Sequence, residues 1–208
     1  MIGVFGGTFD PVHYGHLKPA RDVMRELGLR KVLFIPNHVP PHREQPQLPT
    51  AIRVELLQLA LQEYPGFELD LREIGRNGMS YMLDTLISLK QDYPDESLCL
   101  IIGMDALLGL TRWYCWQRLF EYCHIVVTAR PGYALPDELH PEIKGRVAAS
   151  AQSLRDNEAG KILIKSVSLL DISASDIRQR MARGEDVREW MPASVYHKYS
   201  EIISLNAD

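Results

Sequence analysis

The chain has 208 residues, enough for one domain with a sizeable hydrophobic core, and carries a formal net charge of −4 at pH 7. Hydrophobic residues make up 46% of it and charged residues 24%, as in an ordinary globular protein, and no basic stripe indicates a nucleic-acid partner. Three cysteines without metal-site spacing favour a reducing, cytoplasmic compartment, and we expect no signal peptide, transit peptide or membrane partner, because the chain begins with a strand pattern and has no apolar run of membrane-spanning length.

Apolar runs and helical repeats alternate along the chain. The runs predict buried strands over residues 1–5, 31–36, 67–71, 97–102, 123–129 and 161–167. Apolar positions at helical spacing predict helices over residues 17–27, 50–63, 80–91, 173–183 and 192–203. The second and third of these helices begin at Thr50 and Ser80, whose hydroxyls we expect to cap them.

This alternation is typical of an α/β protein. We expect one domain over residues 1–208, built as a Rossmann-like, doubly wound parallel sheet with helices on both faces and a small C-terminal helical segment over about residues 171–208. The strand order stays open. Ligands of such sheets bind beyond the carboxyl ends of the strands. Four polar clusters fall at those ends, at residues 6–16, 36–43, 103–105 and 171–178.

The first cluster combines two glycines with two histidines. Gly6 and Gly7 end the first strand, and their missing side chains let backbone N–H groups approach a bulky anion. His13 and His16 stand where the next helix begins, three residues apart and so on one face, beside the N–H donors of a helix start. We interpret this segment as a phosphate cradle, in which Gly15 leaves room for a phosphate or a base. The alternative is two ordinary polar residues at a helix start, and a zinc site is disfavoured because no third ligand stands at a suitable spacing.

The last cluster places two hydroxyls and a guanidinium at another helix start. Ser173 and Ser175 are suited to cap N–H groups or to bond phosphate oxygens. Arg178 follows about one turn later on the same face, and a guanidinium binds two phosphate oxygens at once. Taken alone, the segment favours a plain capping motif with a surface arginine. Paired with the first cluster, it predicts a clamp on phosphates.

Both clusters resemble the signatures of a known superfamily. The first reads Gly6-Gly7-Thr8-Phe9-Asp10-Pro11-x-His13-x-Gly15-His16 and resembles the HIGH-type motif of the nucleotidylyltransferases, which class I aminoacyl-tRNA synthetases share. The last reads Ile172-Ser173-Ala174-Ser175-Asp176-Ile177-Arg178 and resembles the second motif of that superfamily. The chain is similar to the bacterial nicotinate-nucleotide adenylyltransferase family over nearly its whole length, apart from residues 133–160 and the last few. The supporting segments are residues 36–43, 76–85, 102–105 and 130–132, with Trp113 and Trp116.

The resemblance implies that ATP and nicotinate mononucleotide react to nicotinate adenine dinucleotide and pyrophosphate, without a covalent enzyme intermediate. Its implied catalytic residues are His13, His16 and Arg178, the last holding the β- and γ-phosphates. The implied ATP-binding residues are Gly6, Gly7, Thr8, Phe9, Gly15, Gly103, Asp105, Ile172, Ser173 and Ser175. Those for nicotinate mononucleotide are His42, Arg43, Ser80, Tyr81, Met82, Asp84, Thr85 and Trp113. We expect Mg²⁺ to accompany ATP without a dedicated protein cage. The oligomeric state stays open, with a homo-oligomer among the options.

Several of these residues carry two interpretations. Asp105 is suited to accept hydrogen bonds from ribose hydroxyls and equally to cap the next helix. His42 and Arg43, like Lys18, either reach phosphate or are solvated charges. For Trp116 we favour a hydrophobic anchor, whereas the resemblance implies that Trp113 stacks on the pyridine ring.

The segment Gly78-Met79-Ser80-Tyr81 precedes the predicted helix that carries Asp84 and Thr85. Its N–H groups are predicted to bind the carboxylate of nicotinate and to prefer it to the neutral amide of nicotinamide. Met82 stands where the family usually has threonine, so recognition at this position rests on the backbone.

Three other functions remain open. Phosphopantetheine adenylyltransferases and cytidylyltransferases share the first motif, but the former are usually shorter and lack the Gly-x-Ser-Tyr element and Trp113. A nucleotide-binding regulator predicts ATP binding without turnover, and the intact His13, His16 and Arg178 argue against it. A class I synthetase fragment is disfavoured because the chain lacks the lysine-rich second signature of those enzymes.

Overall fold

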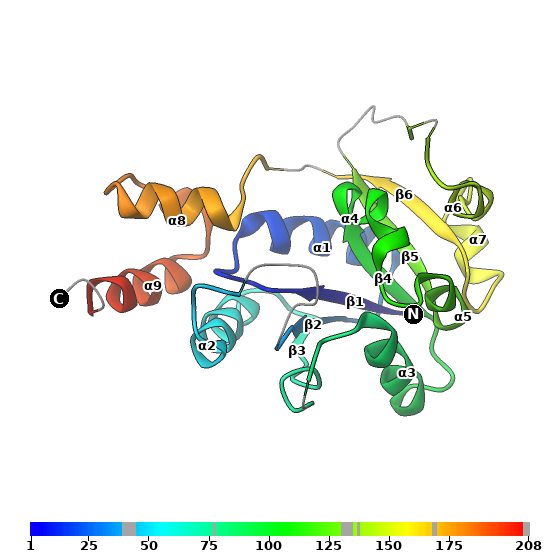
Figure 1. Ribbon diagram of the computed structural model, residues 1–208, viewed down its shortest axis with the longest axis horizontal. Coiled ribbons are helices and arrows are strands. Elements are labelled where there is room, and N and C mark those ends of the chain that lie inside the picture. The colour runs from blue at the N-terminus through cyan, green and yellow to red at the C-terminus, as the bar shows by residue number, and fades with distance from the viewer. Residues whose placement is uncertain (39–44, 77, 130–134, 137, 168–169, 206–208) are drawn as a thin grey trace.

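The computed structural model describes residues 1–38, 45–76, 78–129, 135–136, 138–167 and 170–205 (Figure 1). Six parallel strands form one sheet in the order β3-β2-β1-β4-β5-β6. The strands are β1 (Ile2–Gly7), β2 (Val32–Pro36), β3 (Phe67–Leu69), β4 (Leu98–Gly103), β5 (Cys123–Ala129) and β6 (Ile162–Ser166). The order runs outward in opposite directions from β1 and from β4, so the point where the order reverses lies between these two strands.

Helices cover both faces of the sheet, which confirms the predicted doubly wound fold. One face carries α1 (Tyr14–Leu27), α2 (Thr50–Leu61) and α7 (Gln152–Arg155). The other carries α3 (Met82–Asp92), α4 (Met104–Leu108), α5 (Leu119–Tyr122) and α6 (Pro141–Gly145), with the 3-10 turns η1 (Leu110–Arg112) and η2 (Trp116–Arg118). Along β2, Val32 and Phe34 face the first layer while Leu33 and Ile35 face the second, as the two-residue period of a strand buried on both sides requires.

The predicted C-terminal helical segment consists of α8 (Ala174–Ala182), the 3-10 turn η3 (Arg188–Trp190) and α9 (Ala193–Leu205). Figure 1 shows these helices beyond one end of the sheet, with α9 close to α2. Lys198 on α9 pairs with Glu55 at 3.1 Å, and Ser194 donates a hydrogen bond to Glu63. Ile177, Val195 and Tyr199 are buried in the same core cluster as α1 and α2, so the segment is packed onto the first helical layer. None of the helices in the described ranges has the length and apolar content that crossing a membrane requires.

Two predicted helix caps are wrong. Thr50 is the first residue of α2 rather than its cap, and its hydroxyl accepts a hydrogen bond from Arg53 Nη2. Ser80 lies two residues before α3. Its hydroxyl accepts a hydrogen bond from the backbone N–H of His38, the second residue after β2. In both cases a partner from the tertiary structure takes the oxygen that local propensity assigns to a helix end.

Arg53 is fully buried and joins the segments that follow β1 and β2. Its Nη1 donates to the carbonyl oxygen of Thr8, and its Nη2 donates to the carbonyl oxygen of Asn37 at 2.8 Å. Burial lowers the pKa of this guanidinium, and the charge of nearby Asp10 opposes that shift. Arg53 therefore fixes the loops after β1 and β2 relative to each other.

We expect Arg53→Met to lower the free energy of unfolding by about 3 kcal/mol or more, because it leaves two buried carbonyl groups without their donor. Urea denaturation measures this change. The matched control is Arg30→Met, which removes an exposed guanidinium paired with Glu96 and should cost less than about 1 kcal/mol. Equal losses in the two variants would contradict the role of Arg53.

Candidate active site

The loops after β1 and β2 meet at the carboxyl edge of the sheet. The backbone N–H of Asn37 donates to the carbonyl oxygen of Gly7 at 3.0 Å, and the Asn37 side chain donates to the hydroxyl of Thr8 at 3.2 Å. The polar clusters at residues 6–16 and 36–38 are thus brought together, as expected for parallel strands. His42 and Arg43 lie outside the described residues.

His13 and His16 form the cap of α1 themselves, so this helix begins three residues earlier than predicted. The Nδ1 atom of His13 accepts a hydrogen bond from the backbone N–H of Gly15, and the Nδ1 atom of His16 accepts one from the N–H of His13. The two rings lie 3.8 Å apart, centroid to centroid. Because each Nδ1 is an acceptor, each neutral ring carries its proton on Nε2. The pair therefore offers two Nε2–H donors at the start of a helix.

His13 is only 4% exposed. This burial disfavours the charged ring and lowers the pKa of His13 to about 4. At neutral pH the His13 ring is therefore a neutral hydrogen-bond donor.

The protein itself fills the space that a side chain at residue 15 would need, and the approach of a phosphate or a base to Gly15 stays a prediction. A Cβ atom built on Gly15 would lie 2.8 Å from Nδ1 of His13 and 3.2 Å from the carbonyl oxygen of Ile172. Glycine at this position lets the His13 ring fold back onto the first turn of α1. It also lets the C-terminal motif approach the same turn.

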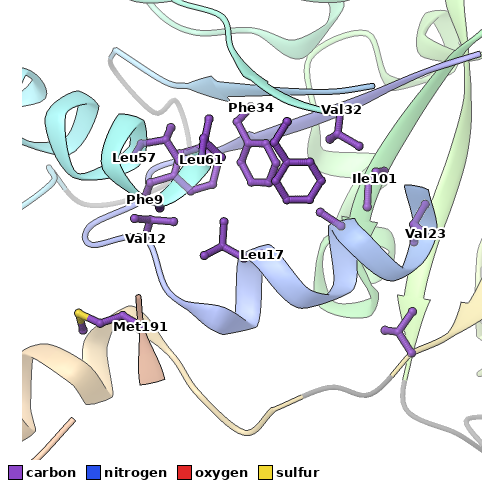
Figure 2. Close-up of a cluster of buried hydrophobic side chains, with 14 of the residues drawn as sticks. Phe9, Val12, Leu17, Val23, Val32, Phe34, Leu57, Leu61, Ile101 and Met191 are labelled. Atoms are coloured by element: carbon purple, nitrogen blue, oxygen red, sulfur yellow. The ribbon is translucent and has the colours of Figure 1, made fainter. Parts of the chain in front are cut away.

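Phe9 was predicted to bind ATP, yet its ring lies in the core and is 1% exposed. Figure 2 shows it beside Leu57, Leu61 and Val12. Its ring also packs edge-on against His16, with centroids 5.2 Å apart, and its backbone has a φ of +51°, which is rare for a bulky residue. Only the backbone of Phe9 remains suited to contact a nucleotide, while the ring supports His16.

The C-terminal motif lies against the first motif. Ser173 caps α8 by accepting a hydrogen bond from the N–H of Asp176, as the capping interpretation predicted. Ser175 and Arg178 share one face of the helix, because Nη2 of Arg178 donates to the Ser175 hydroxyl at 3.3 Å. Nη1 of Arg178 donates to the backbone carbonyl of Asp10 and lies 3.4 Å from its carboxylate. The two signatures therefore form one continuous surface.

Asp10 connects three segments and was missed as a functional residue. Asp10 is buried, and its carboxylate accepts hydrogen bonds from the backbone N–H groups of Gln47 and Leu48, at 2.9 and 3.0 Å, in addition to its contact with Arg178. The first motif contains Asp10, but no spacing in the sequence indicates partners so far along the chain.

At the end of β4, Gly103 and not Asp105 is the N-cap of α4, so the capping interpretation of Asp105 is wrong. The Asp105 side chain is exposed, and its Oδ1 atom lies 2.7 Å from where a Cβ of Gly103 would stand. Gly103 thus makes room for the carboxylate of Asp105 itself. A contact of Asp105 with ribose stays a prediction.

The predicted acceptor site lies at the start of α3. Tyr81 is the N-cap, and its side chain makes no hydrogen bond to the first N–H groups of α3. Binding of a carboxylate by the N–H groups of residues 78–81 stays a prediction. The hydroxyls of Ser80 and Thr85 point inward instead of toward a ligand: Thr85 is fully buried and donates to the carboxyl of Glu73 at 2.6 Å. Glu73 is a second functional candidate that sequence analysis missed.

Three further residues of the predicted acceptor site, Tyr81, Met82 and Asp84, lie at the start of α3. The Cε atom of Met82 occupies the space that Gly6 leaves open, 2.6 Å from an ideal Cβ there, and so joins α3 to the end of β1. The Tyr81 ring packs on the ring of Tyr114, with centroids 4.6 Å apart. Asp84 is exposed. Within the described part of the chain, residues of the predicted ATP site and of the predicted acceptor site thus lie side by side at Gly6 and Met82.

The two tryptophans differ in burial. Trp116 is buried and packs edge-on against Phe120, which confirms the predicted hydrophobic anchor. Trp113 is half-buried at the edge of the same cluster, and its stacking on a ligand stays a prediction. Lys18 lies over the ring of Tyr14, with its Nζ 4.5 Å from the ring centroid.

The sequence model of the cytidylyltransferase-like family matches residues 4–180 of the chain. The chain is 45% identical over 202 residues to a protein of Halorhodospira halophila named probable nicotinate-nucleotide adenylyltransferase, and the match covers 96% of this chain and 93% of that protein. It is 41% identical over 196 residues to a protein of the same name from Aeromonas salmonicida, with 93% and 92% covered.

Solved structures with the same fold include nicotinic acid mononucleotide adenylyltransferase of Plasmodium falciparum. The structure of its complex with NaAD matches with a TM-score of 0.72 and 14% identity over 99% of this chain and 95% of that chain. Its complex with APC gives a TM-score of 0.70, with the same identity and coverage. At this identity the likeness bears on the fold alone.

The lowered pKa of His13 predicts a pH-dependent stability. Below pH 6.5 the unfolded chain binds a proton on His13 that the folded chain does not bind until about pH 4, so stability falls as the pH drops through this window. His13→Asn keeps a capping acceptor but cannot titrate. Between pH 6.5 and pH 4, we expect the free energy of unfolding of the wild type to fall by about 3 kcal/mol more than that of His13→Asn, as measured by urea denaturation. Parallel curves for the two proteins would show that His13 is not held neutral.

Proposed function

We propose that this chain, which belongs to the cytidylyltransferase-like family and within it to the nicotinate-nucleotide adenylyltransferases, transfers the adenylyl group of ATP to nicotinate mononucleotide. The products are nicotinate adenine dinucleotide and pyrophosphate. The observation that carries this proposal is the contact between the two motifs. Arg178 donates a hydrogen bond to Asp10, and the carbonyl oxygen of Ile172 lies beside Gly15. The names of the relatives support the choice of acceptor.

In the proposed reaction, a 5′-phosphate oxygen of the mononucleotide attacks the α-phosphorus of ATP in line. A new P–O bond forms as the bond between the α-phosphorus and the bridging oxygen breaks, and pyrophosphate leaves with the electron pair. The attacking phosphate is already an anion, so no protein nucleophile is needed. The protein contributes positioning and stabilisation of the charge that develops on the phosphate oxygens.

The proposed donors for these oxygens are the Nε2–H groups of His13 and His16, together with the first N–H groups of α1. They are held in place before any ligand arrives, because both rings are fixed through their Nδ1 atoms. Arg178 lies on α8, and its side chain is 20% exposed. We propose that its Nη1 keeps the hydrogen bond to Asp10, while Nη2, which donates to the Ser175 hydroxyl, turns to the leaving pyrophosphate.

The mononucleotide is proposed to lie across the start of α3, with its carboxylate on the N–H groups there and its ring beside Trp113. Asp105 is proposed to accept hydrogen bonds from the ribose of ATP. Among the described residues there is no group of three His, Cys, Asp or Glu side chains that could hold a metal. We propose, from the chemistry of ATP, that Mg²⁺ comes with ATP, bound by phosphate oxygens and water, where it neutralises part of their charge.

The decisive experiment measures pyrophosphate release from ATP with nicotinate mononucleotide, nicotinamide mononucleotide, phosphopantetheine or glycerol phosphate as acceptor. We expect nicotinate mononucleotide to give the highest kcat/KM, and His16→Ala to lower kcat about a hundredfold or more because one charge-stabilising donor is lost. The control His197→Ala changes an exposed histidine of α9 and should leave kcat unchanged. A faster reaction with another acceptor would reject the proposed substrate, and ATP binding without turnover would favour the regulator.

The packing of His13 over Gly15 gives a second test. Gly15→Ala adds a methyl group against the His13 ring, so we expect kcat to fall about tenfold or more, although alanine is the better helix former by about 1 kcal/mol. Gly145→Ala is the matched control, since Gly145 is also helical and a Cβ there meets no atom within 4 Å. Unchanged kcat in Gly15→Ala would show that the position of the His13 ring is unimportant.

A further inference from the structure

We infer that Glu73 is a positioning residue for acceptor selection: it draws the hydroxyl protons of Ser80 and Thr85 inward, so that the start of α3 presents N–H donors to the acceptor. This inference rests on the proposed function. It assigns the preference for an acid over an amide to a buried side chain that does not touch the ligand.

Glu73 lies between β3 and α3 and is only 3% exposed. Its carboxyl accepts the hydroxyl proton of Thr85 at 2.6 Å and is also hydrogen-bonded to the hydroxyl of Ser80. Ser80 lies two residues before α3, and Thr85 is the fourth residue of this helix. Glu73 thus links both ends of the turn that is proposed to bind the acceptor.

Both hydroxyls are also engaged as acceptors. The Ser80 oxygen receives the backbone N–H of His38 at 3.0 Å, and the Thr85 oxygen receives Nη1 of Arg76 at 3.2 Å. Arg76 also donates to the backbone carbonyl of Asp84. Each hydroxyl therefore has its proton on Glu73 and a donor on its oxygen, and neither is directed outward to meet a ligand.

This arrangement discriminates between two kinds of acceptor. A carboxylate needs only donors, which the N–H groups at the start of α3 supply. A carboxamide carries an NH₂ group that needs an acceptor, and the hydroxyl oxygens that would serve are already turned inward. Binding the amide here leaves a polar group unpaired, which is the strongest way in which a site rejects a ligand of the same shape.

The test uses Glu73→Gln and, from the other side of the same hydrogen bond, Thr85→Val and Thr85→Ser. A glutamine presents an NH₂ group to the two hydroxyls, so at least one of them must turn its proton away. For each variant, kcat and KM are measured with ATP, nicotinate mononucleotide and nicotinamide mononucleotide. Glu68→Gln, an exposed residue of β3 paired with Lys31, is the matched control.

In Glu73→Gln we expect the ratio of kcat/KM for the acid to kcat/KM for the amide to fall about tenfold or more, while KM for ATP changes less than about twofold. Thr85→Val should lower this ratio as well, and Thr85→Ser should lower it less. Glu68→Gln should leave the ratio unchanged. A purely structural role would not move the ratio between two acceptors of equal shape.

An unchanged ratio in folded Glu73→Gln would overturn the inference. If that variant does not fold, the threonine pair decides: equal ratios in Thr85→Val and Thr85→Ser would overturn it. A wild type that releases no pyrophosphate with either acceptor would instead reject the proposed function, and the role of Glu73 with it.

Discussion

The contact between Arg178 and Asp10 joins two motifs that are 168 residues apart, and the geometry of the candidate site depends on it. A buried carboxylate is costly unless donors surround it. Asp10 meets this need with a guanidinium from α8 and two backbone N–H groups from residues 47 and 48. The chain segments that supply these donors are thereby held around the loop after β1, the proposed phosphate-binding loop. Loss of any of these donors leaves the charge less compensated, so the loop after β1, α8 and residues 47 and 48 are held together.

The need to pair polar groups also explains why two histidines stand at the start of α1. A helix start has free N–H groups that need an acceptor, and here the Nδ1 atoms of His13 and His16 supply it. Capping fixes the tautomer, and burial keeps His13 neutral at physiological pH. The structural role therefore falls on Nδ1, which binds the helix start, and the proposed chemical role falls on Nε2 of the same ring. Gly15 is needed because the ring must fold back over it.

Much of this arrangement could be predicted from local patterns, and the remainder has a common physical cause. The strands are continuous apolar runs and α1 is strongly periodic, so the sheet, its two helical layers and the histidine pair follow from the sequence. The strand order and the roles of Asp10, Arg53 and Glu73 do not follow. Each of these residues has partners that only the tertiary structure brings near, such as Thr8 for Arg53. The spacing of residues within one helix or strand does not predict such contacts. The caps predicted at Thr50 and Ser80 fail for the same reason, since Arg53 and His38 take those oxygens.

The placement of acidic side chains follows from the charge of the proposed substrates. A triphosphate, a phosphate and a carboxylate are all anions, so an acid that faces them would repel them. Among the described acids at this edge, Asp84 and Asp105 are exposed, whereas Asp10 and Glu73 are buried. Asp10 organises the proposed nucleotide side, and Glu73 organises the proposed acceptor side. Each is surrounded by donors from segments that the site needs in fixed positions. With these carboxyl groups turned inward, the surface between α1, α3 and α8 can present imidazole, guanidinium and backbone N–H groups outward. Met82, seated in the space beside Gly6, then joins α3 to the end of β1, and this contact would help to hold the two proposed sides in place for in-line transfer.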